Sequence, residues 1–279
     1  SRGGQTLFLD FNIHTGVPNY MKNIPAIGPG GKYTGKTYGE YEKIARQFAR
    51  AMLAAWRTGD KDGHIFAFTK FYFHVSRETF ADADQMELLR YACDVASFNG
   101  TPYFVFDHDE VTLAACCRLR TTIDDNYMLT HPESQRFCGF QTVTINLPQA
   151  AYRAGVGNVD GLLAEIDAMM DLVVEAHLQK KEFIKKLMAA PHMPLWQVGR
   201  EACDGRPYID LDKSTYIIGM VGLNECLQHL VGKELHEDDA ALKLGLRIIS
   251  HMYLRAKKYQ AKHGLKFTLE ESPAESATR

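Results

Sequence analysis

The feature that most constrains the fold is the alternation of short apolar strands with amphipathic helices along a chain of 279 residues. We expect strands where apolar and β-branched side chains run together, at 103–106, 142–147, 214–220 and 266–269. We expect helices where apolar side chains recur every three or four residues, at 38–56, 82–98, 158–188, 222–232 and 237–262. This alternation indicates an α/β architecture with mostly parallel strands, in either an open sheet or a barrel.

Composition and charge narrow the classes of function. A net charge of −2 argues against a nucleic-acid binder, which usually carries a basic surplus. There is no run of about 18 apolar residues, so no membrane span is predicted, and no basic segment followed by an apolar one predicts secretion. The chain begins without a methionine and stops just after an expected helix start, so we interpret both ends as cuts in a longer protein.

The cysteines and histidines show no metal-binding pattern. The six cysteines include no CxxC pair, and the eleven histidines show no HxH or HExxH spacing, so we predict no metal site. Scattered cysteines without a secretion signal fit a reducing compartment, and we expect a cytoplasmic protein. Cys116 and Cys117 follow the apolar run 111–115, which predicts a buried segment. Functional thiols and two packed free thiols are both compatible with that position.

A glycine-rich segment matches a phosphate-binding motif. Residues 17–37 are rich in glycine, proline and lysine and predict a long ordered loop. Within it, Gly30–Thr37 reads GGKYTGKT and fits the P-loop expression G-x-x-x-x-G-K-[ST]. A P-loop leaves a buried strand directly, whereas Pro25 and Pro29 interrupt the preceding residues. A plain surface or binding loop is therefore the first interpretation, and a loop that cradles phosphates is the alternative.

Two strand ends carry polar groups that could bind a ligand. Asn146 ends an expected strand, where α/β barrels place functional residues, although a plain strand-ending asparagine fits equally well. After the last strand, Ser272, Pro273 and Glu275 have the residue types expected at the N-cap, N1 and N3 positions of a helix. The free N–H groups of such a helix start suit an anion, and a simple capping box is the alternative.

Four short segments, in order along the chain, carry a resemblance to a known family: Ser1–Gln5 (SRGGQ), Cys116–Leu119 (CCRL), Thr142–Pro148 (TVTINLP) and Glu271–Glu275 (ESPAE). The segment Ile218–Glu225 (IGMVGLNE) is also similar. Together they resemble the class III, anaerobic, glycyl-radical ribonucleoside-triphosphate reductases. The resemblance covers essentially the whole chain.

The resemblance implies a ten-stranded α/β barrel. Residues 1–279 would form its single catalytic core, without the N-terminal regulatory part and the C-terminal glycyl-radical part. A finger loop inside such a barrel carries a cysteine that becomes a thiyl radical. In the family this cysteine directly precedes an arginine, so Cys117, followed by Arg118, is the first candidate and Cys116 the second.

The reaction implied by the resemblance is the reduction of ribonucleotides to the deoxyribonucleotides that DNA replication needs. The thiyl radical takes the 3′-hydrogen of a ribonucleoside triphosphate, and the 2′-hydroxyl leaves as water. Formate or a dithiol supplies the electrons.

The resemblance also assigns substrate-binding roles to Asn146, Ser272, Ala274, Ser276, Thr278, Arg2 and Gln5. Those from position 272 onward would contact substrate phosphates, Asn146 would bond the nucleotide or formate, and the two near the N-terminus would line the site. Glu275, or Glu271 in its place, would act as an acid or base near the ribose.

The implied cofactor is a glycyl radical on a C-terminal segment, with no metal in this part of the protein. The implied partners are the ribonucleoside triphosphate, a radical-SAM activating enzyme and a second copy of the full protein, and the chain alone should not turn over. Three other interpretations stay open. They are a glycyl-radical enzyme with a non-nucleotide substrate, a P-loop ATPase or kinase that uses Gly30–Thr37, and a nucleotide-binding regulatory module.

Overall fold

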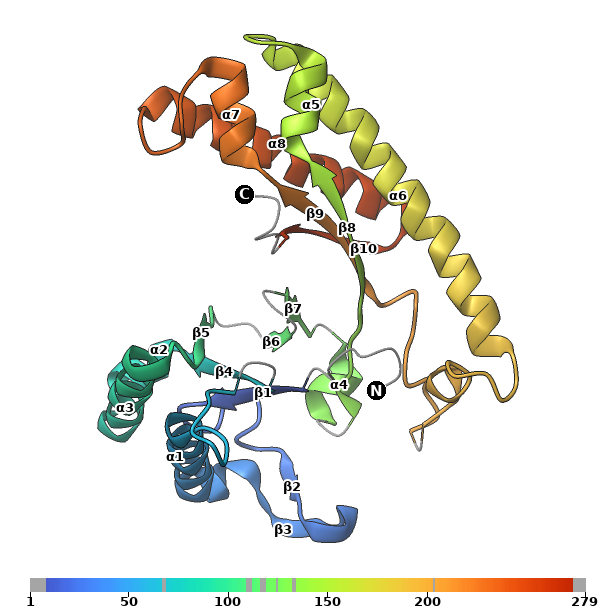
Figure 1. Ribbon diagram of the computed structural model, residues 1–279. Helices are drawn as coiled ribbons and strands as arrows, with labels where there is room; N and C mark the ends of the chain where they lie inside the picture. The colour runs from blue at the N-terminus through green and yellow to red at the C-terminus, as the bar shows by residue number, and fades with distance from the viewer. Residues whose placement is uncertain are drawn as a thin grey trace. The chain divides into compact units, whose positions relative to one another are not determined.

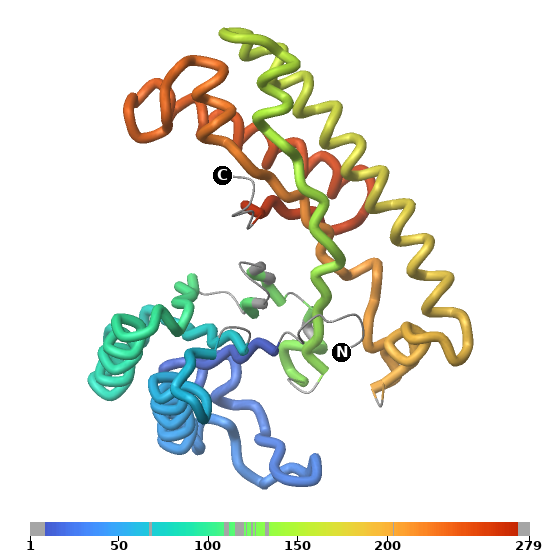
Figure 2. The backbone as a smooth tube through the Cα atoms, in the orientation of Figure 1, coloured from blue at the N-terminus to red at the C-terminus, as the bar shows by residue number. Residues whose placement is uncertain are grey.

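Each half of the chain forms a compact unit around its own three-stranded parallel sheet. The computed structural model describes residues 9–66, 69–108, 112–115, 119–123, 125–131, 134–202 and 204–272. The two units divide after Gln135. Figures 1 and 2 follow the chain through the N-terminal unit, coloured blue to green, and then through the C-terminal unit, coloured green to red.

The sheet of the N-terminal unit has the order β1–β4–β5, with β1 at Leu9–His14, β4 at Thr69–Val75 and β5 at Tyr103–Phe106. Helices α1 (Glu42–Thr58) and α3 (Ala83–Asn99) share one hydrophobic core with the central strand β4. The buried core residues are Ala49, Leu53, Trp56, Phe71, Phe73, Val75, Leu88, Ala92 and Val95. Strand β4 is buried on both faces, so its alternate side chains, including His74, are also enclosed.

Shorter elements complete the N-terminal unit: hairpin strands β2 (Pro25–Ile27) and β3 (Tyr33–Thr37), 3₁₀ turns η1 (Pro29–Gly31) and η2 (Tyr38–Tyr41), α2 (Arg77–Ala81), β6 (Thr112–Ala115), β7 (Leu119–Thr122) and α4 (Asn126–Thr130). Strands β6 and β7 are antiparallel, with Ala115 opposite Leu119. Cys116 and Cys117 follow β6 in the sequence and lie outside the described residues.

The sheet of the C-terminal unit has the order β10–β9–β8, with β8 at Gly139–Asn146, β9 at Thr215–Val221 and β10 at Lys266–Glu271. Its helical elements are α5 (Leu147–Ala154), α6 (Val159–Ala189), η4 (Gln197–Gly199), α7 (Leu223–Val231) and α8 (Asp239–His263). One face of the sheet, with Ile145, Tyr216, Ile218 and Phe267, packs into a core with α6 and α8. In Figure 1 the long helix α6 runs beside β8, and α8 lies beside it.

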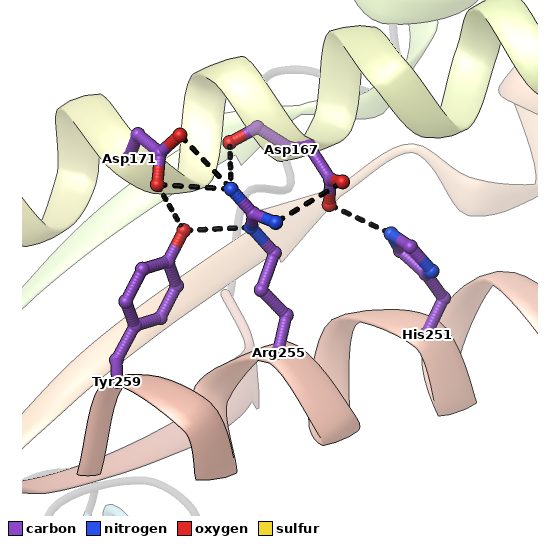
Figure 3. A network of polar contacts seen from close by, with 5 residues as sticks. All are labelled: Asp167, Asp171, His251, Arg255 and Tyr259. Atoms are coloured by element: carbon purple, nitrogen blue, oxygen red, sulfur yellow. Dashed lines mark hydrogen bonds and ion pairs between the residues drawn. The ribbon is translucent and has the colours of Figure 1, made fainter. Parts of the chain in front are cut away.

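A polar network joins α6 to α8 at the rim of this core (Figure 3). The guanidinium of Arg255 contacts Asp167 at 3.1 Å and Asp171 at 2.9 Å. Tyr259 donates a hydrogen bond to Asp171, and His251 Nε2 lies 2.7 Å from Asp167 Oδ1. The network fixes how the two helices face one another, because each carboxylate of α6 is bound by two side chains of α8.

The expected α/β class with parallel strands is confirmed, and the helices and strands expected before residue 272 are present with ends that differ by a few residues. The helix expected to start at Ser272 falls on residues outside the described ones and stays a prediction. The expectation of a loop throughout 17–37 is wrong, because the β2–β3 hairpin lies within it. Strands β1 and β4 were not predicted. The described strands form small sheets, none of which is closed, so the ten-stranded barrel stays a prediction, as does the single core over 1–279. Within the described part of the chain, no helix is both long and apolar enough to cross a membrane.

We expect Asp171→Asn to lower the free energy of unfolding by about 0.5–1 kcal/mol at neutral pH, since the pair with Arg255 is largely exposed and screened. The hydrogen bond from Tyr259, and then the charge of Arg255, hold the pKa of Asp171 below its ordinary value. This stabilisation is therefore complete above the ordinary aspartate pKa of about 4 and is lost as the pH falls through the folded-state pKa. Urea unfolding at neutral pH and near pH 3 should show the difference between wild type and variant shrinking at the lower pH.

Glu175→Gln is the matched control, since it removes a carboxylate of the same helix outside the network. It should show no such pH-dependent difference. An Asp171→Asn defect that persists unchanged in acid would contradict the assignment.

Candidate functional site

Polar side chains gather at the carboxyl ends of the parallel strands in each unit. α/β proteins bind their ligands at such strand ends. In the N-terminal unit, Asn12 and His14 come from β1, His74 comes from β4, and Asp107 follows β5 directly. Because β1 and β4 pair in register with His14 opposite His74, the two imidazoles lie side by side, with ring centroids 4.3 Å apart.

The amide of Asn12 binds the main chain of the second hairpin. Its Nδ2 donates to the carbonyl oxygen of Ala114 at 2.9 Å, and its Oδ1 accepts from the N–H of Ala114 at 2.8 Å. The side chain of Asn12 thus binds both the N–H and the carbonyl oxygen of Ala114, as a neighbouring strand would. Strand β6 is thereby tied to β1.

His74 connects Asn12 to Asp107. Its side chain is fully buried, with Nε2 2.8 Å from Asn12 Oδ1 and Nδ1 2.9 Å from Asp107 Oδ2. The other carboxylate oxygen of Asp107 accepts from the hydroxyl of Thr112 at 2.6 Å. Burial raises the pKa of Asp107, but the hydrogen bonds from His74 and Thr112 outweigh it and hold that pKa below its ordinary value. Asp107 is therefore an ionised carboxylate at neutral pH.

A cavity of about 200 Å³ opens beside this network. Its walls include His14, Tyr20, Lys22, His74 and Asp107. Burial, and then the neighbouring His74, lower the pKa of His14 to about 3, so its imidazole is neutral. Burial, and then the charge of Asp107, raise the pKa of Tyr20 to about 12, so its phenol stays protonated. The cavity thus offers small polar molecules several donors and the carboxylates of Glu78 and Asp107.

His14, His74 and Asp107 also have the chemistry of metal ligands. One donor atom from each lies within 4.8 Å of the others, in a set of two histidines and a carboxylate. Both ring nitrogens of His74 already contact Asp107 and Asn12, so an ion would have to displace one of these contacts. The expectation of no metal stays a prediction.

In the C-terminal unit, the sheet face opposite the core carries hydroxyl groups. Thr144 Oγ1 lies 2.7 Å from Ser272 Oγ, and Thr142 donates to Glu270 at 3.3 Å. Gly219 of the central strand lies beneath them. A Cβ at that position would approach Thr142 Cγ2 to 2.6 Å and Thr144 Oγ1 to 2.7 Å. The absence of a side chain at Gly219 is what lets the outer strands bring their hydroxyls together over the middle strand.

Three of the residues expected in the site are described: Asn146, Glu271 and Ser272. Glu271 is the exposed last residue of β10, and its expected role as an acid or base stays a prediction. Asn146 is exposed and caps α5, where its Oδ1 accepts from the N–H of Gln149 at 3.0 Å. The alternative of a plain asparagine at the strand end therefore accounts for its contacts. Ser272 bonds Thr144 through its hydroxyl and donates its N–H to Met220. The other expected residues, Arg2, Gln5, Cys116, Cys117, Ala274, Glu275, Ser276 and Thr278, lie outside the described residues.

The P-loop interpretation of Gly30–Thr37 is wrong. Residues 33–37 form the exposed strand β3, paired antiparallel with β2, and do not wrap around an anion. The Nζ of Lys36 lies 5.8 Å from the centre of the Tyr41 ring. A P-loop follows a buried strand of a parallel sheet, whereas the strand before Gly30 is the three-residue β2, which pairs antiparallel with β3 in a two-stranded sheet.

The network around His74 was missed by the sequence analysis. Its members come from positions 12, 74 and 107, too far apart for any short motif. A weak signal existed in β1, where Asp10, Asn12 and His14 alternate with apolar residues, as in a strand with one polar face.

The cysteines whose surroundings are described differ from one another. Cys226 is fully buried, and burial raises the pKa of its thiol to about 11. Cys93 on α3 is exposed.

Comparison with known proteins identifies related sequences and structures. Residues 1–279 match the family model described as anaerobic ribonucleoside-triphosphate reductase. No curated protein matches significantly. The anaerobic ribonucleotide reductase from Thermotoga maritima with citrate in the active site is 16% identical with a TM-score of 0.65, over 98% of this chain and 47% of that chain. The same enzyme in complex with dATP and CTP is 17% identical with a TM-score of 0.68, over 98% and 43%.

At these identities the structural likeness shows the fold alone. The chain spans less than half the length of those solved structures.

We expect Lys36→Ala to leave the affinity for ribonucleoside triphosphates unchanged, because β3 forms no phosphate cradle. Isothermal titration of the full protein measures this. Loss of ATP binding in the variant would restore the P-loop interpretation.

We expect Gly219→Ala to lower the free energy of unfolding by about 1–3 kcal/mol, since the new methyl group has no room between Thr142 and Thr144. Urea unfolding measures this. Thr144→Ala should relieve part of the strain, so the double variant should lose less stability than the two single losses added together. Simple additivity would contradict the close approach.

Proposed function

The chain belongs to the anaerobic ribonucleoside-triphosphate reductase family, and from this membership we propose that it supplies the catalytic residues with which a larger protein reduces ribonucleoside triphosphates to deoxyribonucleoside triphosphates. In that protein the two units would be parts of one ten-stranded α/β barrel. The product would serve DNA replication in the cytoplasm.

The observation that carries the proposal is the hairpin that frames the paired cysteines. Cys116 and Cys117 stand in the sequence between β6 and β7, whose antiparallel pairing is defined by Ala115 opposite Leu119. Thr112 and Ala114 of β6 are buried, so the strand that leads to the cysteines is shielded from solvent. A thiyl radical needs such shielding, because water and oxidants would consume it.

In the proposed reaction Cys117 is the residue that exchanges hydrogen with the substrate. A glycyl radical elsewhere in the protein would remove the hydrogen atom from the thiol of Cys117. The Cys117 sulfur would then take the 3′-hydrogen of the ribose and later return a hydrogen atom to the same carbon. The 2′-hydroxyl leaves with a proton as water. The two electrons come from formate, which becomes carbon dioxide, or from a dithiol, which becomes a disulfide.

The carboxyl edge of the C-terminal sheet supports the proposed substrate site. Ser272 closes β10 and lies beside Thr144, at the edge where parallel strands present ligand-binding groups. The N–H of Ser272 is already bonded to Met220, so the phosphate donors would be the groups that follow it, with Ala274, Ser276 and Thr278 among them. Glu275 would be the acid or base near the ribose. The nucleotides bound by the Thermotoga maritima enzyme are consistent with a nucleotide substrate.

Further assignments follow from the same proposal. Arg2 and Gln5 would line the site, and Asn146 would reach the nucleotide or formate while its Oδ1 caps α5. The full protein would be a homodimer and would receive its glycyl radical from a radical-SAM activating enzyme.

We expect Cys117→Ser to abolish turnover by the full protein loaded with its glycyl radical, because a serine O–H bond is too strong to give up its hydrogen to carbon or sulfur radicals. Cys116→Ser should retain activity. The measurement is deoxyribonucleotide formation under anaerobic conditions, with the glycyl radical quantified by electron paramagnetic resonance.

Cys93→Ser is the matched control, since Cys93 is exposed on α3. It should behave as wild type. Turnover by Cys117→Ser that matches Cys116→Ser would refute the assignment of the radical to Cys117.

A further inference from the structure

The partly buried amide of Asn12 has one orientation only. It donates to the carbonyl of Ala114 and accepts from its N–H. Exchanging Oδ1 and Nδ2 would set two donors against each other at the Ala114 nitrogen and two acceptors against each other at its oxygen. The amide oxygen of Asn12 is therefore the atom that faces His74.

This orientation fixes how His74 is held. Asn12 Oδ1 is only an acceptor, so Nε2 of His74, 2.8 Å away, must donate to it. The other ring nitrogen, Nδ1, lies 2.9 Å from Asp107 Oδ2. Both ring nitrogens of His74 are therefore engaged, one by Asn12 and the other by Asp107.

Asp107, which His74 contacts, also binds the start of β6. The carboxylate of Asp107 accepts from Thr112 at 2.6 Å, at the first residue of that strand, while Asn12 holds Ala114 two residues later. Both contacts lie on the strand that precedes Cys116 and Cys117 in the chain. Thr112 and Ala114 are 2% and 5% exposed, so water does not compete for these bonds.

We propose that Asn12, His74 and Asp107 form a positioning clamp. The clamp holds strand β6 in a fixed position and thereby places the Cys117 sulfur relative to the ribose. The inference rests on the proposed function of Cys117. The three are positioning residues, because they act on the main chain of β6 and not on substrate. Hydrogen transfer demands close placement of the reacting atoms, and an error of about 1 Å can cost roughly 100-fold in rate.

The test uses the full protein loaded with its glycyl radical. Asn12→Asp preserves the size of the side chain and the oxygen that faces His74, but it sets an oxygen against the Ala114 carbonyl in place of the Nδ2 donor. We expect kcat to fall by about 10- to 100-fold. KM for the ribonucleoside triphosphate and the glycyl-radical signal should stay within about twofold of wild type, because the clamp does not touch substrate.

Tyr259→Phe is the control, since it also removes partly buried hydrogen bonds, those of its hydroxyl group with Asp171 and Arg255 in the other unit. It should change thermal stability without changing kcat. A defect caused by lost stability alone would follow the melting temperature in both variants, whereas a positioning defect would appear only in Asn12→Asp.

His74→Ala is a second variant, and it can be repaired chemically. The cavity beside the clamp is lined by His74 and Asp107 and gives imidazole a place to bind. Added imidazole should restore kcat at least about tenfold, because it can again bridge Asp107 and Asn12. This measurement decides the case if Asn12→Asp fails to fold.

The outcomes separate the clamp from the function on which it rests. If Cys117→Ser still turns over, the proposed function is wrong whatever the clamp variants do. If Cys117→Ser is inactive while Asn12→Asp keeps wild-type kcat, or while imidazole fails to raise kcat of His74→Ala, the clamp alone is wrong.

Discussion

The N-terminal unit depends on the buried contact between His74 and Asp107. The two residues lie where β4 and β5 end, and polar groups so enclosed are tolerated only when their hydrogen bonds are satisfied. Both ring nitrogens of His74 and both oxygens of Asp107 have hydrogen-bond partners. Removing any member would leave a buried charge or amide without its partner. The pair therefore couples the packing of the sheet to the course of the hairpin that follows it.

The C-terminal unit solves a different problem, which is to keep one sheet face polar. Tyr216 and Ile218 fill the core against α6 and α8, while the next residue of β9, Gly219, has no side chain on the opposite face. Thr144 and Ser272 from the flanking strands meet over that gap. A single glycine thus decides that the carboxyl edge presents hydroxyl groups and not a third layer of apolar packing.

Local patterns were sufficient for most helices and failed for two strands of the N-terminal sheet. The helix expected at 158–188 is α6, because a long amphipathic period with a capping Asn158 leaves few alternatives. Strand β4 was missed because a strand buried on both faces lacks the alternation that reveals a strand. The GGKYTGKT motif was misleading for a related reason. The residue types of a P-loop are present, but the strand before them belongs to an antiparallel hairpin and not to a buried parallel sheet.

The sequence by itself determined the α/β class, the positions of the helices and the family, because periodicity and short motifs are local properties of the chain. It also singled out Cys116 and Cys117. Only the tertiary structure decided that Asn12, His74 and Asp107 meet, since residues so far apart in the chain are brought together by strand order and register alone. The hydrogen bonds of His74 belong to the same class of fact. They depend on which atoms face the ring, and no neighbour in the sequence specifies those atoms.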